Sequence, residues 1–392
     1  MNEPIYLDHA ATTPLAPEVR QAMEPYLREE YGNPSSIHRL GQRARMAVDE
    51  GREQIAAAIG ADPSEIVFTS GGTESDNAAI RGAAFARSHI SRRVVTTSIE
   101  HEAVLETCDE LSAQHGAEVV FIAPDAFGII SVGQVQAAIE EPAALVSVMY
   151  ANNEVGTIQP VADIGAACRE RGVPFHVDAV QAVGVIPIDV KRDSIDLMSI
   201  SAHKFHGPKG VGALYVRKGT PWRAQQLGGG QERLRRSGTE NVTGIVGMAR
   251  ALQLAVEFRD EAAARMLEMR QFLVTRFAAC CPGAVVNGST RDRLPGNVNI
   301  SCPGILGESL VMALDAQGVM VSTGSACSSG TTDPSHVLLA MGCPPEVAAG
   351  AIRLTLGRET TWAEIHKVAE LVPRTVERLR HIESPTPRVA VA

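Results

Sequence analysis

The sequence predicts an α/β protein with a mainly parallel central sheet and a second, smaller α+β domain. Between about residues 66 and 216, seven short apolar runs alternate with stretches of helical pattern. Strands that alternate with helices are joined by right-handed crossovers, which produce parallel sheets. The runs are rich in Val and Ile and almost continuously apolar, which is typical of strands covered on both faces. They read EIVFTS, RRVVTTS, AEVVFIA, ALVSVMY, VPFHVDA, LMSIS and GALYV.

After about Thr243 the pattern changes to that of an α+β domain. Apolar residues at helical spacing extend over residues 243–279 and predict one long helix. Two short strand-like runs, GAVVNG and NVNISCP, and two further helical stretches, GESLVMALDAQG and TTWAEIHKVAELVPRTVERLRHI, follow. Because 392 residues exceed the usual size of one domain, we expect a large domain over residues 14–258 and a small one built from residues 1–13 and 259–392. The long helix should bridge them.

Composition narrows the classes of function. The net charge of −9 gives no general reason to bind nucleic acid or an anionic membrane. The first residues lack the basic and apolar regions of a secretory signal, and no run reaches the roughly 18 apolar residues of a membrane span. We therefore expect a cytoplasmic protein. The seven cysteines contain no CxxC pair, so most should be buried free thiols.

Polar residues gather directly after the apolar runs. Ligands of open α/β sheets lie beyond the carboxyl ends of the strands. Gly72 and Thr73 follow the first run and open a helix, where free N–H groups suit a phosphate, although two glycines before a helix are more often a plain turn. His101 follows the second run and is either structural or stacked on a flat cofactor. Asn152 and Asn153 follow the fourth and either cap a turn or bind ligand oxygens.

Asp178 and Lys204 end two successive runs. A carboxylate directly after a buried strand is costly unless it is paired, and pairing with a protonated pyridine nitrogen would offset that cost. A lysine at a strand end more often extends to the surface. With Asp178 on the neighbouring strand, however, the combination is typical of a pyridoxal phosphate (PLP) site, in which the lysine forms a Schiff base.

Cys327 lies in the small-residue stretch STGSACSSG. Most cysteines are buried packing residues, but this segment is too polar and too rich in glycine for a core. A cysteine in an exposed loop is a candidate nucleophile.

Together these motifs resemble those of a known family. In order they are YLDHAATTP, GNPSSIH, FTSGGTESDN, EHEAV, NNEVGTIQP, HVDAVQ, SAHKFHGPKG, RSGTEN, STGSACSSG and RLTLGR. The chain resembles the class I cysteine desulfurases of the NifS/IscS type, within the PLP-dependent class V aminotransferases. The resemblance extends from Tyr6 to about Arg380 and implies the PLP-dependent transferase fold type I, which is aspartate-aminotransferase-like.

The resemblance implies a cofactor site. Lys204 would carry PLP, Asp178 would bond the pyridine nitrogen and Gln181 the phenolate oxygen. His101 would stack on the ring and act as an acid–base group. The residues expected to hold the phosphate are Gly72, Thr73, Ser201 and His203, together with Thr239, which reaches the cofactor of the other subunit in a homodimer.

The resemblance also implies a substrate and a reaction. Arg353 would bind the carboxylate of L-cysteine, and Asn153 would position the same substrate, with Asn152 as the fallback. The thiolate of Cys327 would take the sulfur as a persulfide while alanine leaves. The persulfide would pass to a sulfur-acceptor or iron–sulfur scaffold protein. No resident metal is expected, the single exception being a transient iron–sulfur cluster at Cys327.

Four other functions compete with this interpretation. A selenocysteine lyase would need nearly the same site and stays open, whereas Cys327 argues against an aminotransferase. A catalytically silent partner of a sulfur-transfer scaffold would need neither Lys204 nor Cys327. A nucleotide-binding protein is disfavoured because no GxxxxGK[ST] motif occurs.

Overall fold

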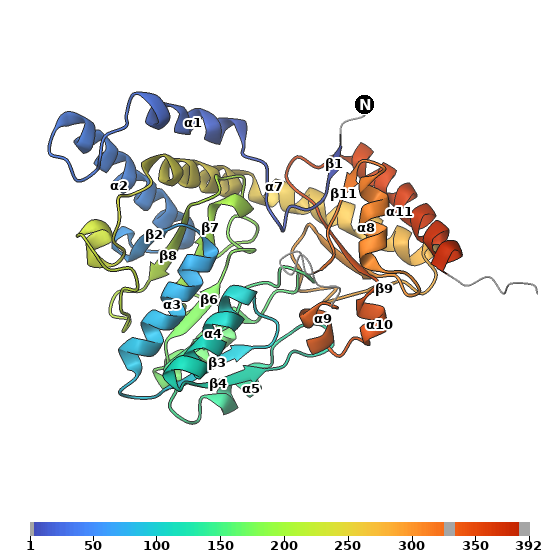
Figure 1. The fold of residues 1–392 in the computed structure, drawn as a ribbon, viewed down its shortest axis with the longest axis horizontal. Coiled ribbons are helices and arrows are strands. Elements are labelled where there is room, and N and C mark those ends of the chain that lie inside the picture. Colours follow the sequence, from blue (N-terminus) through green and yellow to red (C-terminus); the bar gives the residue numbers. More distant parts are fainter. Residues whose placement is uncertain (1–3, 325–333, 384–392) are drawn as a thin grey trace, which may run out of the picture.

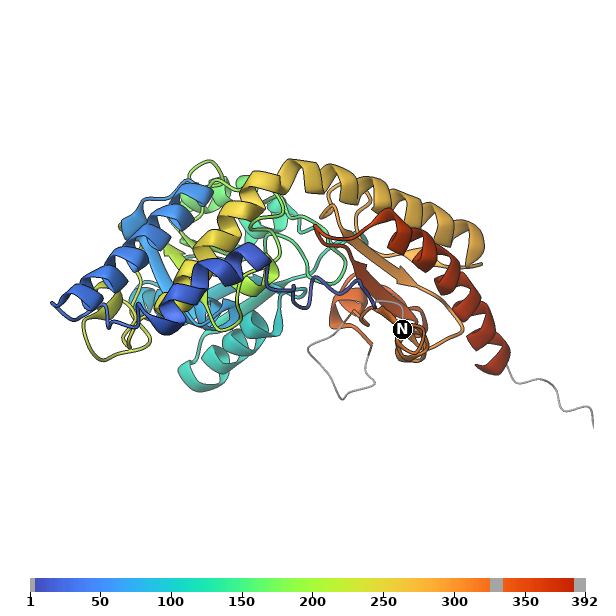
Figure 2. The same ribbon diagram turned by 90° about the horizontal axis from the view of Figure 1, so that it is seen from above.

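The chain folds into two lobes joined by one long helix. The computed structural model describes residues 4–324 and 334–383. Helix α7 (Val242–Cys280) extends along both lobes, as Figures 1 and 2 show. The prediction of a long bridging helix over residues 243–279 is therefore confirmed.

The large lobe is built on a seven-stranded sheet with the order β2-β8-β7-β6-β5-β3-β4. Only β8 runs antiparallel to its neighbours, β2 and β7, and the pairs among β3 to β7 are parallel. Each predicted apolar run contains one of these strands, so the mainly parallel sheet is confirmed. The strands are β2 (Ile66–Thr69), β3 (Arg93–Thr97), β4 (Glu118–Ile122), β5 (Leu145–Ser147), β6 (Phe175–Asp178), β7 (Leu197–Ser201) and β8 (Gly212–Val216).

Helices cover both faces of this sheet. Helices α3 (Gly72–Arg87) and α4 (Glu102–His115) share one apolar cluster with one face. The opposite face packs against α2 (Arg39–Ile59), α5 (Val132–Ala138), α6 (Val161–Arg171) and the first part of α7. Helix α1 (Pro17–Arg28) lies on α7. Three short 3-10 helices complete the lobe: η1 (Pro63–Glu65), η2 (Ala202–Lys204) and η3 (Gln231–Leu234).

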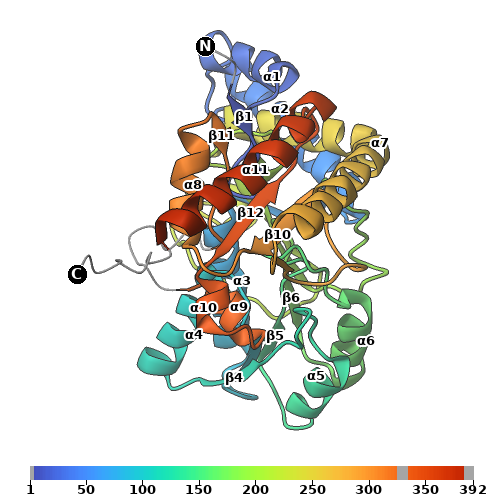
Figure 3. The ribbon, with the colours of Figure 1, turned by 90° about the vertical axis from the view of Figure 1, so that its right-hand side faces the viewer.

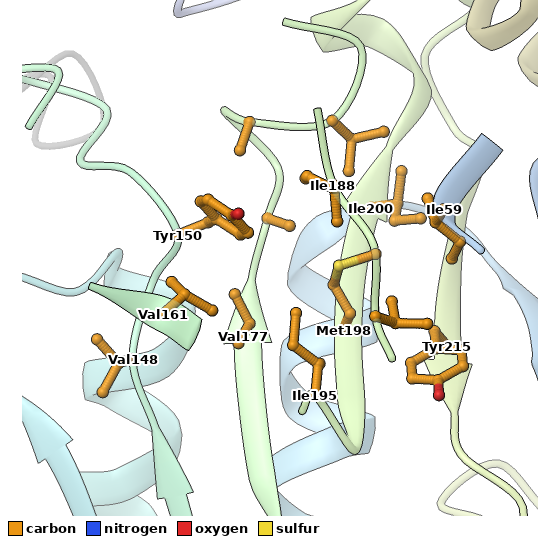
Figure 4. Packing of buried hydrophobic residues seen from close by; sticks show 14 of the residues in the cluster. Ile59, Val148, Tyr150, Val161, Val177, Ile188, Ile195, Met198, Ile200 and Tyr215 are labelled. Carbon is orange, nitrogen blue, oxygen red and sulfur yellow. The ribbon is translucent and has the colours of Figure 1, made fainter. Parts of the chain in front are cut away.

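Toward the carboxyl ends of β6 and β7, apolar side chains point to one face of the sheet and polar side chains to the other. Val177, Met198 and Ile200 point into the apolar core on the α2 and α7 side, together with Tyr215 (Figure 4). Successive side chains of a strand point to opposite faces. The intervening residues, among them Asp178, therefore lie on the face covered by α3.

The small lobe has its own core. Strand β10 (Asn297–Ser301) lies between β12 (Ala351–Thr355) and β9 (Val285–Val286) and is antiparallel to both. Helix α11 (Trp362–Glu383) packs against α7 and α8 (Gly307–Asp315), as Figure 3 shows. The N-terminal strand β1 (Ile5–Tyr6) pairs in parallel with β11 (Val319–Met320). Its Ile5 and the following Leu7 enter this core.

The two short helices after residue 333 connect the lobes. Val337 and Leu338 of α9 (His336–Ala340) belong to the apolar core of the large lobe, and so does Ala348 of α10 (Pro345–Ala348). The limits 14–258 and 259–392 stay a prediction. Within the described residues, none of the helices combines the length and the apolar character needed to span a membrane.

Replacing Ile200 by Ala should destabilise the protein by about 2–5 kcal/mol, because the fully buried side chain would leave a cavity beneath α2 and α7. Denaturant unfolding measures this change. Ile90→Ala is the control, since half of that side chain is exposed and its loss should cost less than about 0.5 kcal/mol. Equal effects of the two substitutions would contradict the assignment of the core.

Candidate active site

A cavity of about 420 Å³ opens at the carboxyl edge of the sheet, between the two lobes. This volume lies within the roughly 300–1,000 Å³ of small-molecule sites. Its walls come from the strand ends of the large lobe, from the N-terminal turn at Ala10 and Ala11, and from Arg353 of the small lobe. The cavity is lined by ten of the residues expected from the sequence: Gly72, Thr73, His101, Asn153, Asp178, Gln181, Ser201, His203, Lys204 and Arg353.

Lys204 projects into the cavity from η2, directly after β7. Its Nζ donates hydrogen bonds to the carbonyl oxygens of Ala10 at 2.5 Å and Ala11 at 2.9 Å. Two carbonyl dipoles stabilise an ammonium group at that position. The amine is therefore held at the strand end where a Schiff-base lysine is needed.

Asp178 ends β6, the strand next to β7, and its side chain is almost completely buried. Burial raises the pKa of this carboxyl, while the nearby His101, the backbone N–H of Val180 at 2.9 Å and Lys204 act in the opposite direction. Because side chains alternate along β6, Val177 points into the core on the α2 and α7 side, and Asp178 points into the cavity on the other side. A pyridinium nitrogen there would supply the positive charge that a buried carboxylate needs.

A second buried acid, Asp76, also lines the cavity and was not expected from the sequence. It lies one turn into α3, and its Oδ1 has no hydrogen-bond partner. That oxygen is 3.6 Å from Nε2 of His176, whose pKa burial lowers to about 3, so the imidazole is neutral. Burial, and then the neighbouring Asp178, raise the pKa of Asp76 well above its usual value. Asp178 is thus the better candidate for the ionised member of the pair.

The phosphate end of the site is formed by the start of α3 and the end of β7. Gly72 begins the helix, and a Cβ at this residue would lie 2.8 Å from Cγ2 of Val180, so only glycine allows this close packing. Ser201 and His203 lie opposite, and Nδ1 of His203 is 3.1 Å from Oγ1 of Thr12. Burial, with the nearby Lys204, lowers the pKa of His203 to about 4. The helix N-terminus and this neutral imidazole offer donors to a phosphate.

His101 caps the N-terminus of α4, where its Nδ1 accepts a hydrogen bond from the Ala103 N–H at 3.0 Å. Nε2 then carries the proton in the neutral ring. Gln181 donates from Nε2 to the carbonyl oxygen of Ala10 at 3.0 Å. Both side chains line the cavity.

Arg353 enters the cavity from β12 and is almost fully buried. Its Nη1 donates to the carbonyl oxygen of Asn153 at 2.9 Å, and its Nη2 donates to Oδ1 of Asp8 at 2.8 Å. Asn152 does not line the cavity, because its side chain bonds the backbone of Ile99 and Glu154. This placement favours Asn153 over Asn152 as the residue near a substrate.

Two expected residues lie elsewhere. Thr239 is exposed and is absent from the wall of this chain's cavity, and Cys327 lies outside the described residues. Sequence reasoning also assigned no role to Glu154 and His336, which line the cavity. Glu154 directly follows Asn153 in the motif NNEVG, and Ala10 and Ala11 lie in the motif YLDHAATTP. Their place in these motifs was the sequence signal that could have identified them as site residues.

The residues fit PLP. The cavity unites an amine on Lys204, a buried carboxylate on the adjacent strand, a helix N-terminus and an arginine from the second lobe. The described residues contain no group of three or more His, Cys, Asp or Glu side chains that could hold a metal ion.

Comparison with known proteins decides the family. The model of the family described as "Aminotransferase class-V" matches residues 5–368. The chain belongs to the class V aminotransferase family. It is 47% identical over 382 residues to "Cysteine desulfurase IscS" of Dictyoglomus turgidum, with 97% of each chain covered. "Cysteine desulfurase IscS" of Methanosarcina thermophila is also 47% identical, over 99% of this chain and 95% of its own.

A solved structure gives the same result. The protein titled "NIFS-LIKE PROTEIN" superposes with a TM-score of 0.90 and 41% identity, covering 96% of this chain and 100% of its own. The fold is therefore the PLP-dependent transferase fold type I. This member of the class V family is a PLP-dependent cysteine desulfurase of the NifS/IscS type, as the sequence predicted.

One acid beside the site should make stability depend on pH. Glu100 is fully buried, and burial raises its pKa to about 8 despite hydrogen bonds from the Met149 N–H and Thr97 Oγ1. The folded state therefore retains a proton that the unfolded chain loses near its ordinary value of 4.5. Between about pH 5 and 8, this group reduces the free energy of unfolding as the pH rises.

Glu100→Gln should remove this dependence. Relative to wild type, the variant should gain stability progressively from about pH 5 to about pH 8 and no further above it. Denaturant unfolding at a series of pH values measures the difference. Parallel curves for the two proteins would contradict the raised pKa.

Proposed function

We propose that the cavity binds PLP on Lys204 and that Cys327 accepts the sulfur of L-cysteine. One observation carries the assignment of the residues. Asp178 ends β6, Lys204 follows the end of the adjacent parallel strand β7, and both line one cavity with Arg353 of the other lobe. The carboxylate of Asp178 would bond the pyridine nitrogen and Gln181 the phenolate oxygen. Gly72, Thr73, Ser201 and His203 would hold the phosphate.

The residues of the chain then share the reaction. Bound PLP supplies an electron sink. Arg353 binds the substrate carboxylate through charge-assisted hydrogen bonds, with Asn153 beside it, while Lys204 or His101 moves the proton. The thiolate of Cys327 attacks the substrate sulfur, so that a sulfur–sulfur bond forms as the carbon–sulfur bond breaks. The carbon takes a proton, alanine leaves, and the sulfur remains as a persulfide.

A homodimer would complete the phosphate site. Thr239 is exposed in this chain and contributes nothing to its own cavity. A role at the cofactor of a second subunit, as the family resemblance implies, accounts for both facts. The persulfide would then be delivered to a sulfur-acceptor or iron–sulfur scaffold protein.

Replacing Cys327 by Ser should abolish release of alanine and sulfide from L-cysteine in the presence of a reductant, while the visible absorbance of the bound cofactor persists. The substitution removes the nucleophile and leaves the cavity intact. Cys343→Ser is the matched control, because this thiol does not line the cavity. Persulfide formed on the Cys327→Ser protein would place the nucleophile elsewhere.

Lys204→Ala should lose both the visible absorbance of lysine-bound PLP and turnover, because no other described lysine lines the cavity. Lys218→Ala, a change on the exposed surface, should retain both. Turnover and absorbance are measured on proteins incubated with PLP. Near-normal alanine release by the Lys204 variant would remove that residue from the Schiff base.

A further inference from the structure

The segment between β1 and α1 crosses from the small lobe to the large lobe (Figure 1), and its residues Ala10 and Ala11 line the cavity. Its turn at residues 8–13 touches several parts of the site. The carbonyl oxygens of Ala10 and Ala11 hold Lys204, and Thr12 contacts His203. At the start of the turn, Asp8 contacts Arg353.

The backbone of Arg353 has a fixed position. Strand β12 pairs with β10 on one side, where Arg353 lies opposite Asn299. On the other side, Arg353 exchanges two backbone hydrogen bonds with Ser322, at 2.7 and 3.1 Å. The freedom that remains is in the long side chain, whose guanidinium must face the substrate in one orientation to form a bidentate pair.

Asp8 is held equally firmly. Its backbone bridges that of Thr355, and its carbonyl oxygen accepts hydrogen bonds from the Tyr6 hydroxyl at 3.1 Å and the Ala11 N–H at 3.0 Å. The Asp8 carboxylate therefore offers Arg353 a stationary anion, 2.8 Å from Nη2. Together with the Asn153 carbonyl at Nη1, it occupies two of the five donors of the guanidinium.

A second acid lies near the same guanidinium. Glu154 is fully buried and lines the cavity. Burial raises its pKa, whereas its hydrogen bond from Ser335 Oγ at 2.5 Å and then the nearby His336 and Arg353 lower it. Without the anion at Asp8, Arg353 would lose its ion-pair partner and could turn toward Glu154, away from the substrate.

We propose that Asp8 is a positioning residue that aims Arg353 at the carboxylate of the amino-acid substrate. Asn153 engages one N–H group of Nη1 and Asp8 one N–H group of Nη2, so the second N–H group of each nitrogen remains for the substrate carboxylate in the cavity that Arg353 lines. The residue thereby contributes to selection of substrates with a free α-carboxylate. This inference rests on the proposed role of Arg353 as the substrate clamp.

The test compares L-cysteine with L-cysteine methyl ester, which lacks the charge that Arg353 binds. We expect Asp8→Asn to raise the KM for L-cysteine about tenfold with kcat within about twofold, because only binding of the carboxylate is weakened. Turnover of the ester and the visible spectrum of the holoenzyme should not change. Asp8→Glu, which keeps the charge but displaces it, should give an intermediate KM and covers the case in which Asp8→Asn folds poorly.

Three further variants distinguish a positioning role of Asp8 from a purely structural one. Glu359→Gln removes an acid from a salt bridge with Arg358 on the surface of the same lobe and should leave both substrates unaffected. Arg353→Ala should lose the preference for the acid over the ester. The double variant of Asp8→Asn and Arg353→Ala should resemble Arg353→Ala alone, because Asp8 acts only through that side chain.

The outcomes are distinguishable. If Asp8→Asn impairs the acid and the ester equally, or if the two substitutions have additive effects on KM, Asp8 is a structural residue and the inference is overturned. If Arg353→Ala keeps the wild-type preference for the acid, the proposed clamp fails, and the role of Asp8 fails with it.

Discussion

Side chains along β6 and β7 alternate between the two faces of the sheet, and this alternation governs the site. On the face covered by α2 and α7, Val177 and Ile200 pack into the core. On the opposite face, Asp178 and Ser201 reach the carboxyl edge and line the cavity. Because β6 and β7 are parallel neighbours, Asp178 at the end of β6 and Ser201 at the end of β7 lie at the same edge of the sheet. A shift of either strand by one residue would turn these polar groups into the apolar core.

The cavity also needs the second lobe. Helix α7 contributes to the apolar cores of both lobes, and the segment before α1 crosses between them near the cavity. Arg353 arrives from β12, whereas Lys204 arrives from the end of β7. The N-terminal turn contacts both side chains, through the carboxylate of Asp8 and the carbonyls of Ala10 and Ala11. Arg353, proposed for the substrate carboxylate, and Lys204, proposed for the cofactor, therefore contact one short piece of chain.

Electrostatics explains why the cavity suits a cationic ring. Burial raises the pKa of four acids at or beside it, Asp76, Glu100, Glu154 and Asp178. Among these, Asp178 is the one whose charge is favoured by both His101 and Lys204. Two neighbouring carboxyls in a buried site do not both ionise readily. One ionised acid beside neutral ones can hold a single positive charge without a surplus of negative charge.

The sequence by itself determined the strands, the long helix and the positions of Lys204 and Asp178, because hydrophobic periodicity and the order of strand ends are local properties of the chain. The family motifs added Arg353 and the choice of Asn153, which the structure places at the cavity. The tertiary structure alone decided the role proposed for Asp8 and the burial of Asp76 in the site. Asp8 is 345 residues from Arg353 in sequence, and nothing local indicates which arginine it meets. Asp76 lies on a helix, where an acidic side chain is ordinarily solvated. Only the packing of α3 over β6 and β7 buries it beside Asp178.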